Sequence, residues 1–556
     1  MIYNEGNEVP VPNLDLLTFL FESEHCAAKE DTPLHAEASD PKYAFTKAHC
    51  RSLAKQFAAF LRDNYAIGAS GPDKDVVVAV STGQSALACL FYGVVAAEGV
   101  YSAASGAGMP KDIARQIRDG PSKVLVCSRD LTKLALEAAK EAGLPRRNVL
   151  ALESYPEVKL GSVDGTVVCD FKRELSWRTI TDQKALERSK ICILYSSGTT
   201  GLPKGVLMSH MNMVSAAAIP ATFNRPYYAE QERQGKPPME RRTLGHLPTA
   251  HVAGVMGYFV HPFYEAGLVY WMPGFDFDRF LTYCRDLRIT TFFTVPPIFM
   301  AIAKHPAVTD QFRHMRNAVS GAAPLTADLQ EAASKKMGLT EEPILQTWGM
   351  SETTGSATYM PPGRKVTMGS LSPLIPNVTM RLVDEDGKDV KRGEPGEALI
   401  RGPIVTMGYH NNDEANNNAY TPDGWLRTGD ILREQDGEFY LVDRKKELIK
   451  YKGLQIAPAE LEGVIASHPS ILDAAVIGVQ QEDTEVPRAY VVLAPPAVDK
   501  LTEDDVVRYV ESKVAGYKRL RGGVKFVDAV PRSPSGKILR KEVREMRKRE
   551  EKGSKL

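Results

Sequence analysis

The segment from residue 195 to residue 205, Y-S-S-G-T-T-G-L-P-K-G, combines small residues, hydroxyl groups and one lysine directly after an apolar run. Such a backbone can approach an anion closely, and its N–H groups, hydroxyls and ammonium group can donate to phosphate oxygens. The dinucleotide pattern G-x-G-x-x-G is absent, and the Walker pattern does not fit because its G-K-[ST] step is missing. Composition alone leaves both a phosphate-binding loop and a flexible turn open.

Six further motifs follow this segment along the chain. They are L-P-T-A-H-V-A-G (247–254), S-G-A-A-P-L (320–325), Q-T-W-G-M-S-E-T (346–353), G-W-L-R-T-G-D (424–430), D-R-K-K-E-L-I-K-Y-K-G-L-Q-I-A-P-A-E-L-E (443–462) and P-R-S-P-S-G-K-I-L-R (531–540). In content and order, the seven motifs resemble those of the adenylate-forming (ANL) superfamily, which comprises acyl-CoA synthetases, adenylation domains and beetle luciferases. Within it, the chain is most similar to 4-coumarate–CoA ligase-like enzymes, and luciferases come next.

The resemblance implies a two-step reaction that uses ATP, Mg²⁺ and coenzyme A (CoA). A carboxylate attacks the α-phosphate of ATP and releases pyrophosphate, and a thiol then displaces AMP. The first step gathers negative charge and needs cationic stabilisation. The resemblance assigns this to Lys537, the catalytic lysine, and to Glu352, which with Thr200 would hold Mg²⁺. His251 is a third catalytic candidate, although a lone histidine in an apolar loop is also compatible with a structural role.

The resemblance also places ATP and AMP on motif residues. Asp430 would accept hydrogen bonds from both ribose hydroxyls, since a carboxylate offers two acceptor oxygens. Trp348, which replaces a tyrosine common at this position, would stack on adenine. The predicted nucleotide-binding residues are Ser196, Ser197, Gly198, Thr199, Thr200, Lys204, Ala323, Gln346, Thr347, Trp348, Ser351, Asp430, Arg444, Lys450 and Lys537.

The acyl pocket is expected to be apolar and without an obvious charge, which suits an aryl, arylalkanoic or medium-chain acid. Small residues at Ala250 and Ala253 leave more room than the aromatic residues of plant coumarate ligases, so the acid is expected to differ from coumarate. The predicted pocket residues are His251, Val252, Ala253, Val295, Gly321, Ala322, Gly349, Met350 and Thr354.

The last part of the chain is expected to move between the two steps. By resemblance, Lys446 is the hinge, and Lys452 and Gly453 contact CoA once the small domain has rotated. A charged, exposed strand is an equally simple interpretation of Lys452.

Continuous apolar strands alternate with helices over most of the chain, which predicts an α/β fold with parallel sheets. Expected strands are 75–80, 123–128, 148–152, 191–195, 290–295 and 343–348, with helices at 85–98 and 130–143. Short strands between Gly- and Asp-rich turns predict a small β-rich, barrel-like subdomain from about residue 369. We place the main boundary near 444, which gives an AMP-binding domain (1–443) and a mobile α+β domain (444–556). The latter has expected helices at 459–467 and 504–515 and strands at 474–479, 489–494 and 524–530.

Composition narrows the function classes. The 556 residues carry 69 Lys and Arg and 69 Asp and Glu, so no net basic field attracts nucleic acid or an anionic membrane. The 7 cysteines are scattered without a C-x-x-C pair, which argues against disulfide and zinc frameworks. No basic n-region or membrane-length apolar stretch is present, so we expect a soluble intracellular protein.

The chain ends in Ser554, Lys555 and Leu556, the tripeptide read by the peroxisomal import receptor, although a charged tail can also end this way by chance. The sequence thus predicts a peroxisomal, ATP-dependent acid–CoA ligase. Two alternatives remain at this point: a luciferase-like adenylate-using oxygenase, and an acyl-AMP ligase with a non-CoA acceptor. A silent ligand-binding relative is disfavoured because Lys537, Glu352 and Asp430 are all present.

Overall fold

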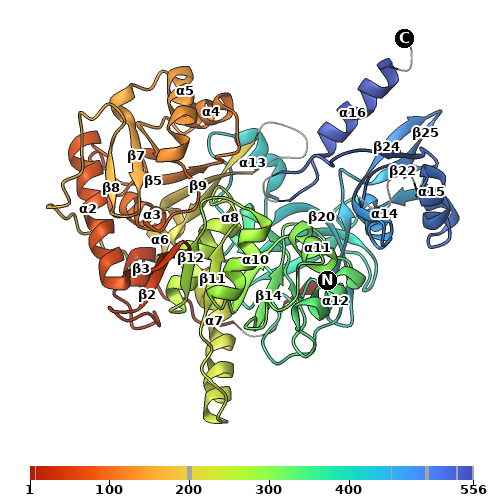
Figure 1. The fold of residues 1–556 in the computed structure, drawn as a ribbon, viewed down its shortest axis with the longest axis horizontal. Helices are drawn as coiled ribbons and strands as arrows, with labels where there is room; N and C mark the ends of the chain where they lie inside the picture. Colours follow the sequence, from red (N-terminus) through yellow and green to blue (C-terminus); the bar gives the residue numbers. More distant parts are fainter. Residues whose placement is uncertain are drawn as a thin grey trace.

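The computed structural model describes residues 1–4, 6, 8–196, 203–452, 454–494, 500–533 and 536–553, without side chains from 551 onward. Its larger part contains three sheets wrapped by helices and a fourth, antiparallel sheet, and the smaller C-terminal part lies at one end (Figure 1). The description as α/β with mixed sheets and a C-terminal α+β part is confirmed.

The first sheet has 7 strands, in the order β10-β9-β5-β4-β6-β7-β8. Its central five strands are parallel and its two edge strands are antiparallel, as expected from apolar runs that are buried on both faces. The strands are β4 (Val76–Val80), β5 (Val100–Ala104), β6 (Val124–Ser128), β7 (Val149–Glu153), β8 (Lys159–Ser162), β9 (Lys190–Ser196) and β10 (Lys204–Ser209). The covering helices are α2 (Lys47–Tyr65), α3 (Ala86–Ala96), α4 (Pro110–Asp119), α5 (Thr132–Ala142) and α6 (Gln183–Arg188).

Two further sheets carry the middle of the chain. One has the order β11-β12-β2-β3, and the other has the order β13-β14-β15 with all strands parallel. Their strands are β2 (Pro33–Glu37), β3 (Asp40–Thr46), β11 (Arg242–Gly245), β12 (Leu268–Trp271), β13 (Thr291–Thr294), β14 (Asn317–Ser320) and β15 (Leu345–Gln346). A two-stranded hairpin, β16 (Gly349–Met350) and β17 (Gly355–Ser356), follows β15.

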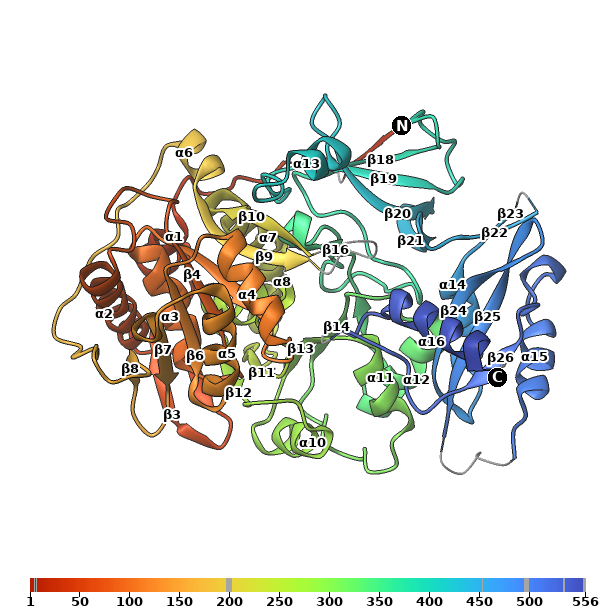
Figure 2. The same cartoon turned by 90° about the horizontal axis from the view of Figure 1, so that it is seen from above.

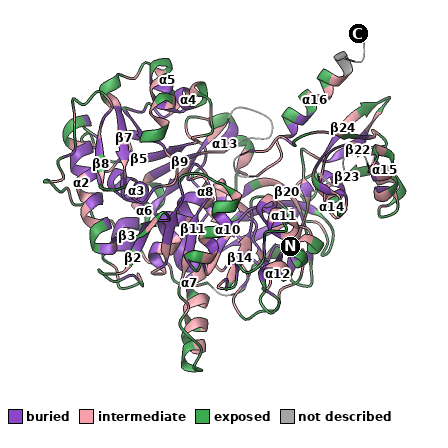
Figure 3. Ribbon diagram, in the orientation of Figure 1, coloured by how far each residue is buried: buried purple, intermediate pink, exposed green. Residues whose placement is uncertain are grey.

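The helices of this region are α1 (Leu16–Phe21), α7 (His210–Arg233), α8 (Val252–Gly254), the π-helical η3 (Val255–Val260), α9 (His261–Tyr264), α10 (Phe277–Asp286), α11 (Pro296–Lys304) and α12 (Ala327–Met337). The far end of α7 projects from the body and is largely exposed (Figure 3). One continuous apolar cluster joins the first three sheets, so they form one packed unit. No helix within the described ranges combines the length and the apolar character needed to cross a membrane.

The β-rich part expected from residue 369 is a sheet of order β1-β18-β19-β20-β21, and its own strands start at residue 379. The sequence did not predict that the N-terminal strand β1 (Ile2–Tyr3) would pair with β18 (Thr379–Val383). The remaining elements are β19 (Gly396–Arg401), α13 (Asp413–Ala419), β20 (Leu426–Gln435) and β21 (Glu438–Arg444).

The C-terminal part begins after β21 and has its own apolar clusters. Its elements are β22 (Ile449–Tyr451), β23 (Leu454–Ile456), α14 (Pro458–Ala466), β24 (Ile471–Gln481), β25 (Thr484–Leu493), α15 (Glu503–Glu511), β26 (Val524–Phe526) and α16 (Arg540–Gly553). The strand predicted over 524–530 ends at Phe526, and the helix predicted over 504–515 ends at Glu511. Seen from above, α14 lies beside α11 and α12 of the larger part (Figure 2).

Candidate active site

A cavity of about 680 Å³ lies where the larger part of the chain meets the C-terminal part. Its walls come from the end of β9 and the start of β10, the α8–η3 segment, the β16–β17 hairpin, β20 and the loop before α16. The structure brings the following predicted site residues to this one cavity: Ser196, Lys204, His251, Val252, Ala253, Gly321, Ala322, Thr347, Gly349, Met350, Ser351, Glu352, Asp430, Arg444, Lys446 and Lys537.

Lys537 reaches the cavity from the C-terminal part. Its backbone N–H donates to Ser533 Oγ over 3.2 Å, and its carbonyl accepts from Ser533 N, which holds the loop. Burial, together with the nearby Arg444 guanidinium, lowers the pKa of Lys537 from 10.5 to about 8, while Glu447, Asp430 and Glu352 oppose this lowering. The ammonium group is therefore close enough to two carboxylates of the larger part, Asp430 and Glu352, to interact with them electrostatically.

Glu352 lies in the turn between β16 and β17. Thr353 holds this turn, since its hydroxyl donates to Gly355 O over 2.7 Å and accepts from Met350 N over 2.9 Å. The Glu352 carboxylate accepts a 2.8 Å hydrogen bond from the Tyr409 hydroxyl, and the Lys204 ammonium lies 4.8 Å from the centre of the Tyr409 ring. Burial first, and then Glu352, raises the pKa of Tyr409.

Tyr409 links the two charged groups Glu352 and Lys204, and the sequence interpretation did not include it. Tyr409 lies outside the seven motifs and is brought to the site by backbone pairing of residues 407–410 with β10. This pairing joins segments about 200 residues apart and leaves no signal in the sequence.

Asp430 is held by two partners. The Trp348 indole N–H donates to Asp430 Oδ2 over 2.8 Å, and Arg444, which pairs with Asp430 across β20 and β21, places Nε 3.4 Å from Oδ1. Trp348 is 5% exposed and does not line the cavity. The Trp348 indole therefore orients the Asp430 carboxylate, while its stacking on adenine stays a prediction.

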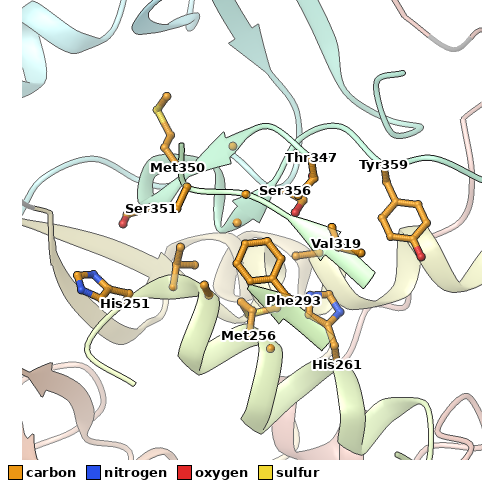
Figure 4. Close-up of a pocket in the computed structure, with 18 of the residues that line it drawn as sticks. His251, Met256, His261, Phe293, Val319, Thr347, Met350, Ser351, Ser356 and Tyr359 are labelled. Carbon is orange, nitrogen blue, oxygen red and sulfur yellow. The ribbon is translucent and has the colours of Figure 1, made fainter. Parts of the chain in front are cut away.

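His251 directly precedes α8 at the cavity wall, and its side chain is half-buried (Figure 4). Burial lowers its pKa below 6.5, so the imidazole is neutral at physiological pH. Its Nε2 atom has no hydrogen-bond partner among the residues that the structure describes. A buried polar atom without a partner is costly, and a polar group of a bound molecule would satisfy it.

Besides Trp348, six predicted site residues do not reach the cavity. Thr354 is fully buried, and its hydroxyl donates to Ile404 O over 2.8 Å. The side-chain amide of Gln346 accepts a hydrogen bond from Leu325 N and donates one to Gln330 Oε1. Val295 is buried at the start of α11, and Ala323 lies outside the lining. The remaining two are Lys450 and Lys452, which lie on the exposed β22–β23 hairpin of the C-terminal part.

Part of the prediction falls outside the described residues. These residues are Ser197, Gly198, Thr199, Thr200 and Gly453, together with the C-terminal tripeptide.

The deep end of the cavity corrects the expected apolar pocket. Its sides are apolar and formed by Ala217, Met256, Phe293 and Val319, some of which appear in Figure 4. Its far end is polar, and the residues there are Asn224, Tyr228, Arg241, His261, Glu265 and Tyr359.

One carboxylate at this far end is shared by two guanidinium groups, which leaves one net positive charge among the three. The Glu265 carboxylate contacts Arg225 at 2.8 Å and Arg241 at 3.3 Å, so it carries two cationic partners. Asn224 donates only a long 3.4 Å bond to the Tyr359 hydroxyl, and its Oδ1 is buried without a partner among the described residues. Burial lowers the pKa of His261 to about 4, so this ring is neutral. Uncharged hydrogen-bonding groups thus remain free to meet a bound molecule.

The described residues contain no cluster of three or more His, Cys, Asp or Glu side chains that could hold a metal ion. Glu352 nevertheless fits one ligand position of Mg²⁺, because this ion keeps water and phosphate oxygens as its other ligands.

Comparison with known proteins identifies the family. Residues 24–410 match the model of the AMP-binding enzyme family, and residues 460–537 match the AMP-binding enzyme C-terminal domain. The chain belongs to the AMP-binding enzymes. This AMP-binding enzyme is 46% identical over 553 residues to a protein of Emericella nidulans named "Putative acyl-coenzyme A synthetase", with 98% of each chain covered.

Two further likenesses agree with this. The chain is 34% identical over 509 residues to "4-coumarate--CoA ligase-like 9" of Oryza sativa subsp. japonica, covering 89% of this chain and 86% of the relative. ATP-bound MatB from Rhodopseudomonas palustris superposes with a TM-score of 0.80 at 27% identity, covering 96% of this chain and 98% of the other. The resemblance to adenylate-forming, 4-coumarate–CoA ligase-like enzymes is confirmed.

The lowered pKa of Lys537 predicts a pH dependence. Lys537 is charged below about pH 8 and neutral above it. If the ammonium form acts on ATP, kcat/KM for pyrophosphate release falls as the pH rises through about 8, approaching tenfold per unit. The Lys537→Arg variant keeps its charge and should lose this alkaline limb, whatever its absolute rate. A flat wild-type profile up to pH 9.5 would contradict the assignment.

Proposed function

We propose that this AMP-binding enzyme is an ATP-dependent acid–CoA ligase. A carboxylate oxygen of the acid attacks the α-phosphorus of ATP, and the bond to pyrophosphate breaks. The CoA sulfur then attacks the acyl carbon, and AMP leaves. One observation carries the proposal: Lys537 of the C-terminal part shares a cavity with Glu352, Asp430 and His251 of the larger part.

Each of these residues has a defined task in the first step. The Lys537 ammonium neutralises the charge that accumulates between the carboxylate and the α-phosphate, and its partial burial strengthens this interaction. Asp430, oriented by Trp348, accepts hydrogen bonds from the ribose hydroxyls. The neutral His251 ring offers a hydrogen bond to the carboxylate without acting as a base, since the acid is already ionised at neutral pH.

The metal-binding part of the proposal involves Glu352 and Thr200. Mg²⁺ bound there would neutralise phosphate charge and help pyrophosphate to leave. Tyr409 holds the Glu352 carboxylate in place through its 2.8 Å hydrogen bond. Lys204, positioned over the Tyr409 ring, adds a positive charge on the phosphate side of the cavity.

The second step requires access for a thiol. Lys446 is exposed at the cavity rim, directly after β21, and is proposed as the hinge of a rotation that withdraws Lys537. Lys452 and Gly453 are proposed to meet CoA in the rotated state. The exposed position of Lys452 on the C-terminal part fits a role that begins only after rotation.

The cavity also defines a substrate class. Its sides are apolar and its far end offers Asn224 Oδ1 and the neutral His261 ring. We propose an acid with an aryl or aliphatic body and one uncharged hydrogen-bonding group, such as a hydroxyl, at the end remote from the carboxylate.

A substrate panel tests the proposed reaction. The protein is incubated with ATP, Mg²⁺, CoA and aryl, arylalkanoic and medium-chain acids, and pyrophosphate, AMP and thioester are followed separately. We expect AMP and thioester to appear in equal amounts for at least one acid. Pyrophosphate release without thioester would contradict CoA as the acceptor, and light emission with a luciferin would favour the oxygenase alternative.

A matched pair of acids tests the far end of the cavity. For two acids of identical skeleton, with and without a terminal hydroxyl, we expect kcat/KM to favour the hydroxy acid about tenfold, the value of one good hydrogen bond. Asn224→Leu should abolish this preference, and the plain acid serves as the internal control because it makes no such bond. An unchanged preference in Asn224→Leu would refute the assignment.

We also propose peroxisomal import through Ser554, Lys555 and Leu556, supported by the position of this tripeptide at the C-terminus. A fluorescent fusion that leaves the C-terminus free should accumulate in peroxisomes. Deletion of the three residues should leave it in the cytosol, and an unchanged distribution would reject the signal.

A further inference from the structure

Helix α14 of the C-terminal part is bound at its N-terminal end by the larger part of the chain. The helix starts at Pro458, and its N-cap residue, Ala457, supplies no capping side chain. Instead Asp443, at the end of β21, accepts a 3.0 Å hydrogen bond from Ala459 N, while Arg444 N donates to its other oxygen. Asp443 is 3% exposed, so its side chain binds these backbone N–H groups rather than water.

The C-terminal end of α14 is bound in the complementary way. Lys304 is the last residue of α11, and its ammonium donates to Ala466 O over 3.1 Å and to Ile471 O. A helix carries partial positive charge at its N-terminus and partial negative charge at its C-terminus. The larger part therefore presents a carboxylate to the positive end of α14 and an ammonium to the negative end.

The middle of α14 is in close contact as well. A Cβ atom placed on Gly463 would lie 2.5 Å from Thr326 Cγ2, and the next nearest atom, Thr326 Cβ, would be 3.9 Å away. Thr326 precedes α12 of the larger part. We call Asp443, Lys304 and Thr326 the α14 seat. A side chain at position 463 would therefore press on the Thr326 methyl group when the helix is in the seat.

The seat is connected to Lys537 by an ion pair. Glu462 of α14 accepts from Arg540 at 2.9 Å and 3.0 Å, and Glu447 contacts the same guanidinium at 3.1 Å. Arg540 lies three positions after Lys537, and its side chain is buried. The opposite face of α14 contributes Leu461 and Ile465 to the core of the C-terminal part. Helix α14, this core and the Lys537 loop are thus joined by direct contacts and are expected to move together.

We propose that the α14 seat fixes the C-terminal part in the orientation that places Lys537 in the cavity, and that Asp443, Lys304 and Thr326 are positioning residues for adenylate formation. The proposal rests on the proposed function, because it assumes two half-reactions that need different orientations. Release of both helix ends and of the Gly463 contact would accompany rotation about Lys446. The seat is then needed for the first half-reaction and not for the second.

The Gly463→Ala variant tests the seat at its tightest contact. Alanine is a better helix former than glycine, so α14 itself should not be weakened. We expect the rate of pyrophosphate release from ATP and acid to fall about tenfold. Thioester formation from supplied acyl-adenylate and CoA should remain unchanged. The double variant Gly463→Ala, Thr326→Ser lacks the opposing Cγ2 methyl group and should recover the wild-type adenylation rate.

Lys304 provides a second, independent variant. Lys304→Met keeps the length of the side chain but removes the donor and should slow adenylation selectively, whereas Lys304→Arg should retain most of the rate. Equal losses in both half-reactions, or no recovery in the double variant, would overturn the proposal.

Amide hydrogen exchange of α14 gives a readout that needs no substrate. Exchange should be faster in Gly463→Ala than in the wild type and return to the wild-type rate in the double variant. If the wild type released no pyrophosphate with any acid, the proposed function would fail. The exchange rates would still decide whether α14 is held by the seat: identical rates in all three proteins would reject it.

Discussion

The electrostatic interaction of the Lys537 ammonium with the carboxylates around it is the interaction on which the rest of the site depends. Lowering the pKa of Lys537 from 10.5 to about 8 corresponds to a cost of about 3 kcal/mol for keeping the charge in this position. Asp430 and Glu352 of the larger part and Glu447 of the C-terminal part reduce that cost, and bound phosphates would reduce it further. The Lys537 charge is thus only partly compensated by its neighbours. In a cavity that a nucleotide can enter, such a cation can stabilise the negative charge that develops during a reaction. Without the C-terminal part, the cavity would lack the Lys537 cation.

The scaffold serves this arrangement by fixing the acidic partners rigidly. Asp430 is anchored by the Trp348 indole and by pairing across β20 and β21, and Glu352 is anchored by Tyr409 and by a hairpin in which a Cβ on Gly349 would lie 1.8 Å from Gly355 O. Preorganised groups of this kind need no rearrangement when charge develops. The C-terminal part therefore carries the lysine, while the sheets of the larger part carry the groups that receive it.

The sequence predicted those features that are local or encoded in contiguous motifs. Buried strands such as Val76–Val80 are continuous apolar runs, so their position and parallel arrangement could be predicted. Features that depend on distant residues could not be predicted. One example is the strand pairing of Tyr3 with Met380. Another is the end of the cavity, where Asn224 and Arg241 come together. A third is Trp348, whose hydrogen bond is to Asp430, 82 positions further along the chain. The motif located Trp348 in the site, but ring orientation is decided by tertiary packing. The polar far end was missed because its residues come from separate helices and strands outside the motifs.

The most direct test of this account separates the two half-reactions in Lys537→Ala. Adenylate formation is measured as pyrophosphate release from ATP and acid, and thioester formation is measured from chemically supplied acyl-adenylate and CoA. The account predicts that adenylate formation falls by about a hundredfold or more, the typical effect of losing a charged group aimed at the transition state, while thioester formation is retained. Loss of both half-reactions to the same extent, or retention of adenylate formation, would contradict the central role of the buried lysine.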